Sequence, residues 1–183
     1  MTLHFLSTLA MLAVVLPAFA QQKNASPQTL AHVRNSFVLT VHAPYDETAP
    51  LFGPMGERGW AGQRWDPRFL YPQPAEDVEG AVFTVQHGEH KSVWVNTVFD
   101  LDAHYFQYVY FIPDVVVTVI DVNFDSLEGG NTQVHVVYTR TALNVAANDD
   151  VKALGESDAR SGKQWEEAVN AYLESRKHSD SSR

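Results

Sequence analysis

WEEAVNAYL, residues 165–173, decides the fold class, because its apolar side chains recur at the spacing of a single helix face. Within a helix predicted over Ser157–Lys177, the apolar positions i, i+4, i+7 and i+8 are Trp165, Val169, Tyr172 and Leu173. Only one stripe of this helix is apolar. The stripe therefore has to be buried against another element of the fold.

Upstream of this helix the chain is rich in predicted strands. Turn signals separate them, including Pro72 and Pro74, HGEH at 87–90 and LEGGN at 127–131. The predicted strands are about Phe37–Val41, Phe69–Tyr71, Gly80–His87, Ser92–Asp100, His104–Ile112, Val115–Phe124 and Thr132–Leu143. Such spacing is typical of consecutive antiparallel hairpins. The long helix then packs on the apolar face of an antiparallel sheet, which is an α+β fold.

Between the first two strands, Pro44 followed by Asp46 and Glu47 predicts a short helix running to about Phe52. The next stretch, LFGPMGERGWAGQRW (51–65), has glycine at every third position. It is too short for a collagen triple helix. It also lacks both glycine-rich motifs that bind phosphates.

The N-terminus predicts export. LAMLAVVLPAFA is a continuous apolar run that ends in a small-x-small cleavage pattern, so we expect a signal peptide, residues 1–20, cleaved after Ala20. An uncleaved anchor is the alternative, because MTLH at the start has no Lys or Arg. A linker over 21–33, one domain over 34–177 and a disordered tail over 178–183 complete the predicted organisation.

Charge and cysteine content limit the partners. The net charge is −9 and there is no Lys/Arg cluster, which disfavours nucleic acid and anionic lipid headgroups. The absence of cysteine excludes disulfides, a thiolate nucleophile and a Cys metal site. These features fit a periplasmic or secreted bacterial protein that has no stable membrane anchor after cleavage.

Five stretches carry a family resemblance: VHAPYDETAPLFGPMGERGWAGQRWDPRFLYP (41–72), GAVFTVQHG (80–88), YFQYVYFIP (105–113), TQVHVVYTRTALN (132–144) and WEEAVNAYL (165–173). Together they resemble the SRPBCC superfamily, also called START-like or polyketide cyclase/dehydrase-like. The resemblance implies a helix-grip fold, in which a curved sheet of about seven strands wraps around the C-terminal helix and leaves an apolar cavity. Two short helices close one end. The glycine stretch would be their corner, with glycines for tight turns and close approach.

If each strand turns its more apolar face inward, alternation gives the cavity lining. The predicted ligand-binding residues are Phe83, His87, Phe99, Phe106, Tyr108, Tyr110, Tyr138, Arg140 and Trp165. The same rule places Val93 and Val95 inside. For Val115–Phe124 both faces are apolar and alternation cannot choose, and a β-bulge in any strand would invert an assignment.

The polar candidates each have a plainer interpretation. His87 and His90 form H-x-x-H, but they lie across a turn with no third ligand, so we predict no metal and no cofactor. Glu57 and Arg58 fit a surface charge pair better than a pair at the cavity mouth. Arg140 could orient a carboxylate, or could be a strand-end arginine whose head reaches water.

Three functions remain open from the sequence. The first is an exported binding protein for a hydrophobic or amphipathic small molecule such as a lipid. The second is a cyclase or aromatase-like enzyme, in which Tyr108, Tyr138, His87 or Arg140 assists an aldol-type closure. The third is an interaction or stress module whose bulky inner aromatics fill the core.

Overall fold

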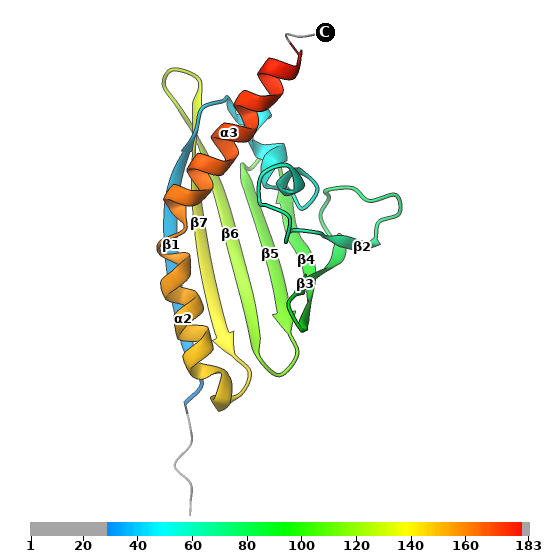
Figure 1. Cartoon of the computed structure of the whole chain (residues 1–183), viewed down its shortest axis with the longest axis vertical. Coiled ribbons are helices and arrows are strands. Elements are labelled where there is room, and N and C mark those ends of the chain that lie inside the picture. The colour runs from blue at the N-terminus through cyan, green and yellow to red at the C-terminus, as the bar shows by residue number, and fades with distance from the viewer. Residues whose placement is uncertain (1–28, 181–183) are drawn as a thin grey trace, which may run out of the picture.

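The computed structural model describes residues 29–180, and seven antiparallel strands form one sheet in the order β1-β7-β6-β5-β4-β3-β2 (Figure 1). The strands are β1 (His32–Val41), β2 (Arg68–Tyr71), β3 (Val82–His87), β4 (His90–Asp100), β5 (Tyr105–Ile112), β6 (Val116–Leu127) and β7 (Asn131–Ala142). Strands β2 to β6 each pair with the next strand along the chain, and β1 pairs with β7. The predicted helix-grip fold is confirmed.

Helices cover one face of this sheet (Figure 1). They are α1 (Tyr45–Thr48), α2 (Asn148–Asp158) and α3 (Gly162–Asp180), with short 3₁₀ segments η1 (Ala49–Phe52), η2 (Gly56–Gly59) and η3 (Val145–Ala147). Figure 1 shows α2 and α3 following one another along β1, while the short helical segments lie beside α3 over the middle strands. Within residues 29–180, no helix is long and apolar enough to cross a membrane.

The C-terminal helical region differs from the single helix predicted over Ser157–Lys177. Helix α2 ends at Asp158 and α3 begins at Gly162. The break places the Asp158 carboxylate against the sheet, and a Cβ at Gly162 would lie 3.0 Å from the Val38 carbonyl oxygen of β1. The region around the break, GESDARSG, is also poor in strong helix formers.

On β4 the prediction that Val93 and Val95 face inward is wrong. The buried side chains are Ser92, Trp94 and Asn96, and the register shifts between Asn96 and Val98. This bulge shifts the alternation by one residue, so that odd-numbered positions face inward after it. Phe99 therefore faces inward, as predicted, and stacks on Phe106 with ring centroids 4.1 Å apart.

The error has a physical cause, because the outer face of the middle strands is also apolar. Val93 lies opposite Phe111, which lies opposite Val117, and Val95, Val109 and Val119 form a second row. On β6 the inner residues, which alternation could not assign, are Val116, Thr118, Ile120, Val122 and Phe124. The alternation on β5 and β7 was predicted correctly, with Phe106, Tyr108 and Tyr110 and then Val134, Val136 and Arg140 buried.

The glycine stretch forms the compact corner that the resemblance implied. A Cβ at Gly56 would lie 1.9 Å from the backbone oxygen of Pro50, so only glycine fits between η1 and η2. Gly62 has φ +87°, a conformation that glycine adopts without strain, and it turns the chain back toward Trp65. The corner holds Trp60 and Trp65 over the inner face of the sheet.

The ends of the chain bear on the predicted boundaries. Strand β1 begins at His32, inside the segment predicted as a linker over 21–33. Helix α3 extends to Asp180, so residues 178–180 of the predicted tail are helical. Residues 181–183 and the predicted signal peptide over 1–20 lie outside the described residues.

Candidate functional site

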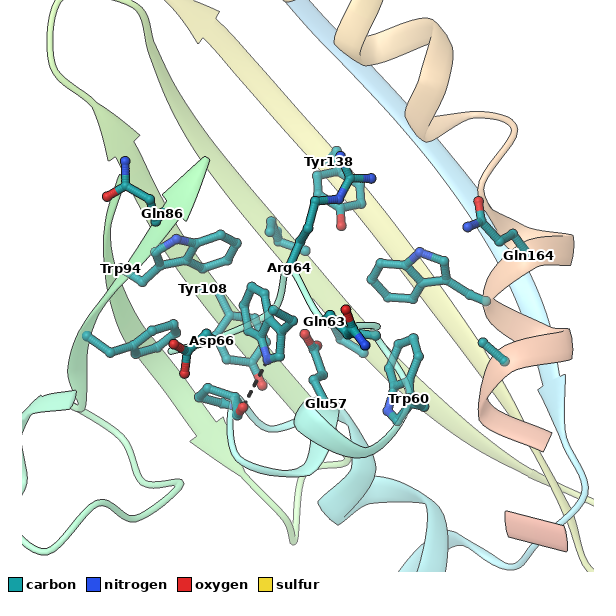
Figure 2. Close-up of a pocket in the computed structure, with 18 of the residues that line it drawn as sticks. Glu57, Trp60, Gln63, Arg64, Asp66, Gln86, Trp94, Tyr108, Tyr138 and Gln164 are labelled. Carbon is teal, nitrogen blue, oxygen red and sulfur yellow. Dashed lines mark hydrogen bonds between the residues drawn. The ribbon is translucent and has the colours of Figure 1, made fainter. Parts of the chain in front are cut away.

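A cavity of about 700 Å³ lies between the inner face of the sheet, helix α3 and the corner over 54–66 (Figure 2). Strands β3 to β7 supply its floor, and α3 and the corner supply its walls. Its lining is rich in aromatic side chains: Trp60, Trp65, Phe83, Trp94, Tyr108, Tyr138 and Trp165. The site is thus built from the elements that the helix-grip fold brings together, and it is not filled by them.

The tryptophans are held rigidly. The indole nitrogens of Trp60, Trp65 and Trp94 donate to the Leu51 oxygen, the Pro54 oxygen and Ser92 Oγ at 2.7, 3.0 and 2.8 Å. Edge contacts link them in pairs, with ring centroids 5.1 Å apart for Trp60 and Trp165 and 5.3 Å for Trp65 and Trp94. With three N–H groups already engaged, these walls offer ring faces and edges to a ligand.

Tyr108 ties the corner to the floor of the cavity. Its hydroxyl donates to the carbonyl oxygen of Phe52 at 2.8 Å. Burial raises the pKa of this phenol well above its usual value, and the nearby carboxyls of Glu57 and Asp77 raise it further. Tyr108 therefore stays protonated and serves as a hydrogen-bond donor.

Glu57 points its carboxyl into the cavity (Figure 2). It lies on η2, and among residues 29–180 its carboxyl has no hydrogen bond and no ion pair. Burial raises the pKa of Glu57 well above its usual value, and the negative charge of Asp77 adds to the shift. The carboxyl is poised to exchange a proton or to accept a cationic partner.

Asp77 lies beneath the same turn but is fully engaged. It accepts the backbone N–H of Met55 with both oxygens, at 2.9 and 3.1 Å. Burial raises the pKa of Asp77, while the N–H groups of Met55 and Gly56 and the charge of Arg58 oppose the rise. Asp77 thus fixes the start of η2 and so the position of Glu57.

Tyr138 on β7 is a second polar group that lines the cavity. Its hydroxyl has no hydrogen bond within the described part of the chain. Burial raises the pKa of Tyr138 well above its usual value, and the negative charge of the Glu57 carboxyl raises it further. Tyr138 and Glu57 therefore act on each other across the same space.

The mouth of the cavity is more polar than its interior. Its exposed side chains are Gln63, Arg64, Asp66, Gln86 and Gln164. Asp66 pairs with Arg68 at 2.6 Å, and Gln86 donates to the Gly88 oxygen at 2.7 Å. The rim thus adds polar groups to those that Glu57 and Tyr138 supply inside the cavity.

Arg140 lies outside the lining, in a buried cluster under α2. Its Nε and a terminal nitrogen donate to the two oxygens of Asp158 at 2.6 and 2.8 Å, and the other terminal nitrogen donates to Thr118 Oγ1 at 3.0 Å and to the Tyr110 hydroxyl. Burial lowers the pKa of Arg140, but hydrogen bonding and charge from Asp158 and Tyr110 outweigh it. Its guanidinium neither reaches water nor faces the cavity, contrary to both predictions, and its replacement would test folding rather than binding.

The cavity brings together four of the nine predicted ligand-binding residues: Phe83, Tyr108, Tyr138 and Trp165. Phe99 and Phe106 pack together away from the lining, and Tyr110 belongs to the Arg140 cluster. The backbone of His87 ends β3, and its side chain lies outside the described ones.

Sequence reasoning missed Trp60, Trp65 and Trp94 as lining residues and assigned Glu57 to the surface. The signal for Glu57 was present, because it sits inside a glycine-rich corner just before Trp60 and Trp65. His90 is exposed, and among the described residues no group of three His, Asp or Glu side chains is placed to hold a metal ion.

No model of a known protein family matches the sequence, and no curated protein matches it. Solved structures do match the fold. A protein of unknown function from Staphylococcus aureus, SA2116, is 14% identical with a TM-score of 0.59, over 81% of this chain and 98% of that one. Norcoclaurine synthase from Thalictrum flavum is 8% identical with a TM-score of 0.57, over 89% and 97%. Ara h 8.0201 is 12% identical with a TM-score of 0.52, over 79% and 99%. At these identities the likeness establishes the fold alone.

Proposed function

We propose that this protein binds an amphipathic small molecule in its internal cavity. The observation that carries the proposal is a cavity of about 700 Å³ with a rigid aromatic lining and a polar rim. Its volume lies within the usual range of small-molecule sites, about 300–1,000 Å³. The same cavity argues against an interaction module with a filled core. Norcoclaurine synthase, which its name describes as an enzyme, has a similar fold.

Native and denaturing mass spectrometry of residues 21–183 test the proposal. A stoichiometric small molecule that is released on unfolding would support it and would identify the chemical class. A protein that carries no ligand and ignores apolar fluorescent probes would contradict it.

A matched pair of variants on α3 localises the binding. Ala168 lines the cavity, whereas Ala171 on the same helix is exposed. We expect Ala168→Phe to displace the ligand or probe and Ala171→Phe to leave it bound. Equal binding by both variants would place the ligand elsewhere.

Acid–base catalysis is a second candidate, favoured because Glu57 and Tyr138, a carboxyl and a phenol, line the same cavity. In an intramolecular aldol closure, ionised Glu57 would take the proton from the carbon next to one carbonyl. That carbon would bond to the second carbonyl carbon, and the new alkoxide would take a proton back. Glu57 and Tyr138 are therefore the candidates for assisting the closure. Arg140, which the sequence suggested for this, is bound to Asp158 instead.

Deuterium exchange separates catalysis from binding. With 2,6-heptanedione in D₂O, NMR would follow exchange at the carbons next to the carbonyls. An enzyme of this kind accelerates the exchange, and Glu57→Gln removes the acceleration. Exchange at the rate without protein would leave binding as the function.

We further propose that the protein is exported and cleaved after Ala20. The apolar run and the small-x-small ending of the leader support this. Intact mass of the exported protein tests it, because a species that retains residues 3–20 would overturn cleavage.

A further inference from the structure

From the unpartnered carboxyl of Glu57 among ring faces, and building on the proposed binding function, we infer that the ligand is an amphipathic amine. Its ammonium group would meet Glu57 inside the cavity, and its apolar body would lie between the tryptophans. The cavity would then select for the positive charge as well as for size and hydrophobicity.

Glu57 differs from other buried or partly buried acids of this protein in having no partner among the described residues. Asp158 pairs with Arg140 at 2.6 Å, Asp77 accepts a backbone N–H at 2.9 Å, and Glu166 accepts the N–H of Thr40 at 2.7 Å. Glu57 alone among these four acids has no such partner. Glu57 is half-buried. A carboxylate that is largely removed from water is costly unless a positive charge or a hydrogen-bond donor faces it, so the missing partner is one that a ligand can supply.

The aromatic walls of the cavity also favour a positively charged ligand. Trp60, Tyr108 and Trp165 line the same space as Glu57, and electron-rich ring faces attract an ammonium group within about 6 Å of their centroids. Because the indole N–H of Trp60 and the hydroxyl of Tyr108 are already donating, they do not compete for the carboxylate of Glu57. A carboxylate ligand would instead face Glu57 and Asp77 as like charges.

The charged groups around Glu57 determine which other classes of ligand the cavity could bind. Asp77 below it is negative, and Tyr108 and Tyr138 are neutral phenols. Arg64 at the rim lines the cavity but forms no ion pair with Glu57. The alternative ligand is therefore a carboxylic acid whose carboxylate pairs with Arg64.

Three indole probes of similar size separate these readings by calorimetry: tryptamine, tryptophol and indole-3-acetate. We expect tryptamine to bind most tightly. Glu57→Gln should weaken tryptamine by about 30-fold, as for the loss of a buried charge partner, and should change tryptophol by less than about twofold. The isosteric amide keeps the shape of the site, and an unchanged circular dichroism spectrum of the folded variant guards against misfolding.

Proton linkage gives a second readout. Because the free carboxyl holds its proton to higher pH than usual, an ammonium ligand should displace it, releasing up to about one proton per ligand. Titrations in buffers of different ionisation enthalpy measure this release, and Glu57→Gln should abolish it. Binding of tryptophol should release none.

The outcomes distinguish this inference from the function on which it rests. Tryptophol binding as tightly as tryptamine, or Glu57→Gln leaving tryptamine unchanged, would overturn the amine while leaving the binding function intact. Tighter binding of indole-3-acetate that is lost in Arg64→Gln would overturn it in favour of an acid. Failure of all three probes, together with no native ligand, would overturn both proposals.

Discussion

Two ionisable side chains, Arg140 of β7 and Glu57 of η2, lie on the same side of the sheet and have opposite surroundings. Arg140 makes four hydrogen bonds, to Asp158, Tyr110 and Thr118, and its guanidinium is shut off from the cavity. Glu57 points into the cavity and has no hydrogen bond or ion pair among the described residues. A charge whose partners are all supplied by the protein stabilises one arrangement of the chain. A charge without a partner is available for a ligand or a proton.

The largest effect is expected on the Arg140 side of this comparison. Asp158→Ala leaves the guanidinium buried without its carboxylate and should lower the free energy of unfolding by about 3–5 kcal/mol. Urea unfolding at neutral pH measures the loss. The double variant Arg140→Met with Asp158→Leu should recover most of it, because no charge is left unpaired. If Asp158→Ala is as stable as the natural chain, the cluster is not structural.

Tyr110 and Tyr138 allow the same comparison between a partnered and an unpartnered polar group, because replacing either by phenylalanine removes only the hydroxyl oxygen. The Tyr110 hydroxyl accepts from Arg140, whereas the Tyr138 hydroxyl lines the cavity without a hydrogen bond in the described part of the chain. Tyr110→Phe should cost about 1.5–3 kcal/mol, as for a hydrogen bond to a charged group. Tyr138→Phe should cost less than about 0.5 kcal/mol. Equal losses in urea unfolding would mean that Tyr138 also has a structural partner.

Much of this architecture follows from the sequence. Period-2 alternation identifies the strands, and on β5 and β7 it also identifies the buried face, since each runs without a bulge. On β4 it fails, because the register shift between Asn96 and Val98 depends on pairing with β5 and because the outer face is apolar too. A local pattern cannot reveal a bulge whose cause is the neighbouring strand.

The roles of Arg140 and Glu57 were predicted the wrong way round for a related reason. Arg140 is a cavity residue by alternation, but its partner Asp158 lies on α2, a helix that the sequence analysis largely missed. Glu57 next to Arg58 has the pattern of a surface pair, yet Arg58 turns away to donate to the Pro67 oxygen. Whether a charged group has a partner thus depends on residues far away in the sequence and on where a neighbouring side chain points. Neither can be read from the local sequence pattern.

Glu57→Gln should stabilise the free protein, and more so at higher pH. Because burial raises the pKa of Glu57, the stability linked to its protonated form is complete below the unfolded pKa, about 4.3, and is lost as pH rises through the folded pKa. Glutamine cannot ionise, so the variant's advantage should grow with pH, by about 1.4 kcal/mol for each unit of the shift. Urea unfolding at pH 4.5 and pH 8 measures it. An advantage independent of pH would contradict a raised pKa.

The smallest effect is expected from Asp66→Asn, which removes the same charge at the rim of the cavity. Asp66 pairs with Arg68 at 2.6 Å, but the two side chains are 54% and 76% exposed. An exposed pair of this kind contributes about 0–1 kcal/mol, so the free energy of unfolding and tryptamine affinity should both stay close to those of the natural chain. If Asp66→Asn weakened tryptamine as much as Glu57→Gln, overall negative charge at the cavity would explain amine binding. If only Glu57→Gln weakens it, the cause is the burial of a carboxyl that the fold leaves without a partner.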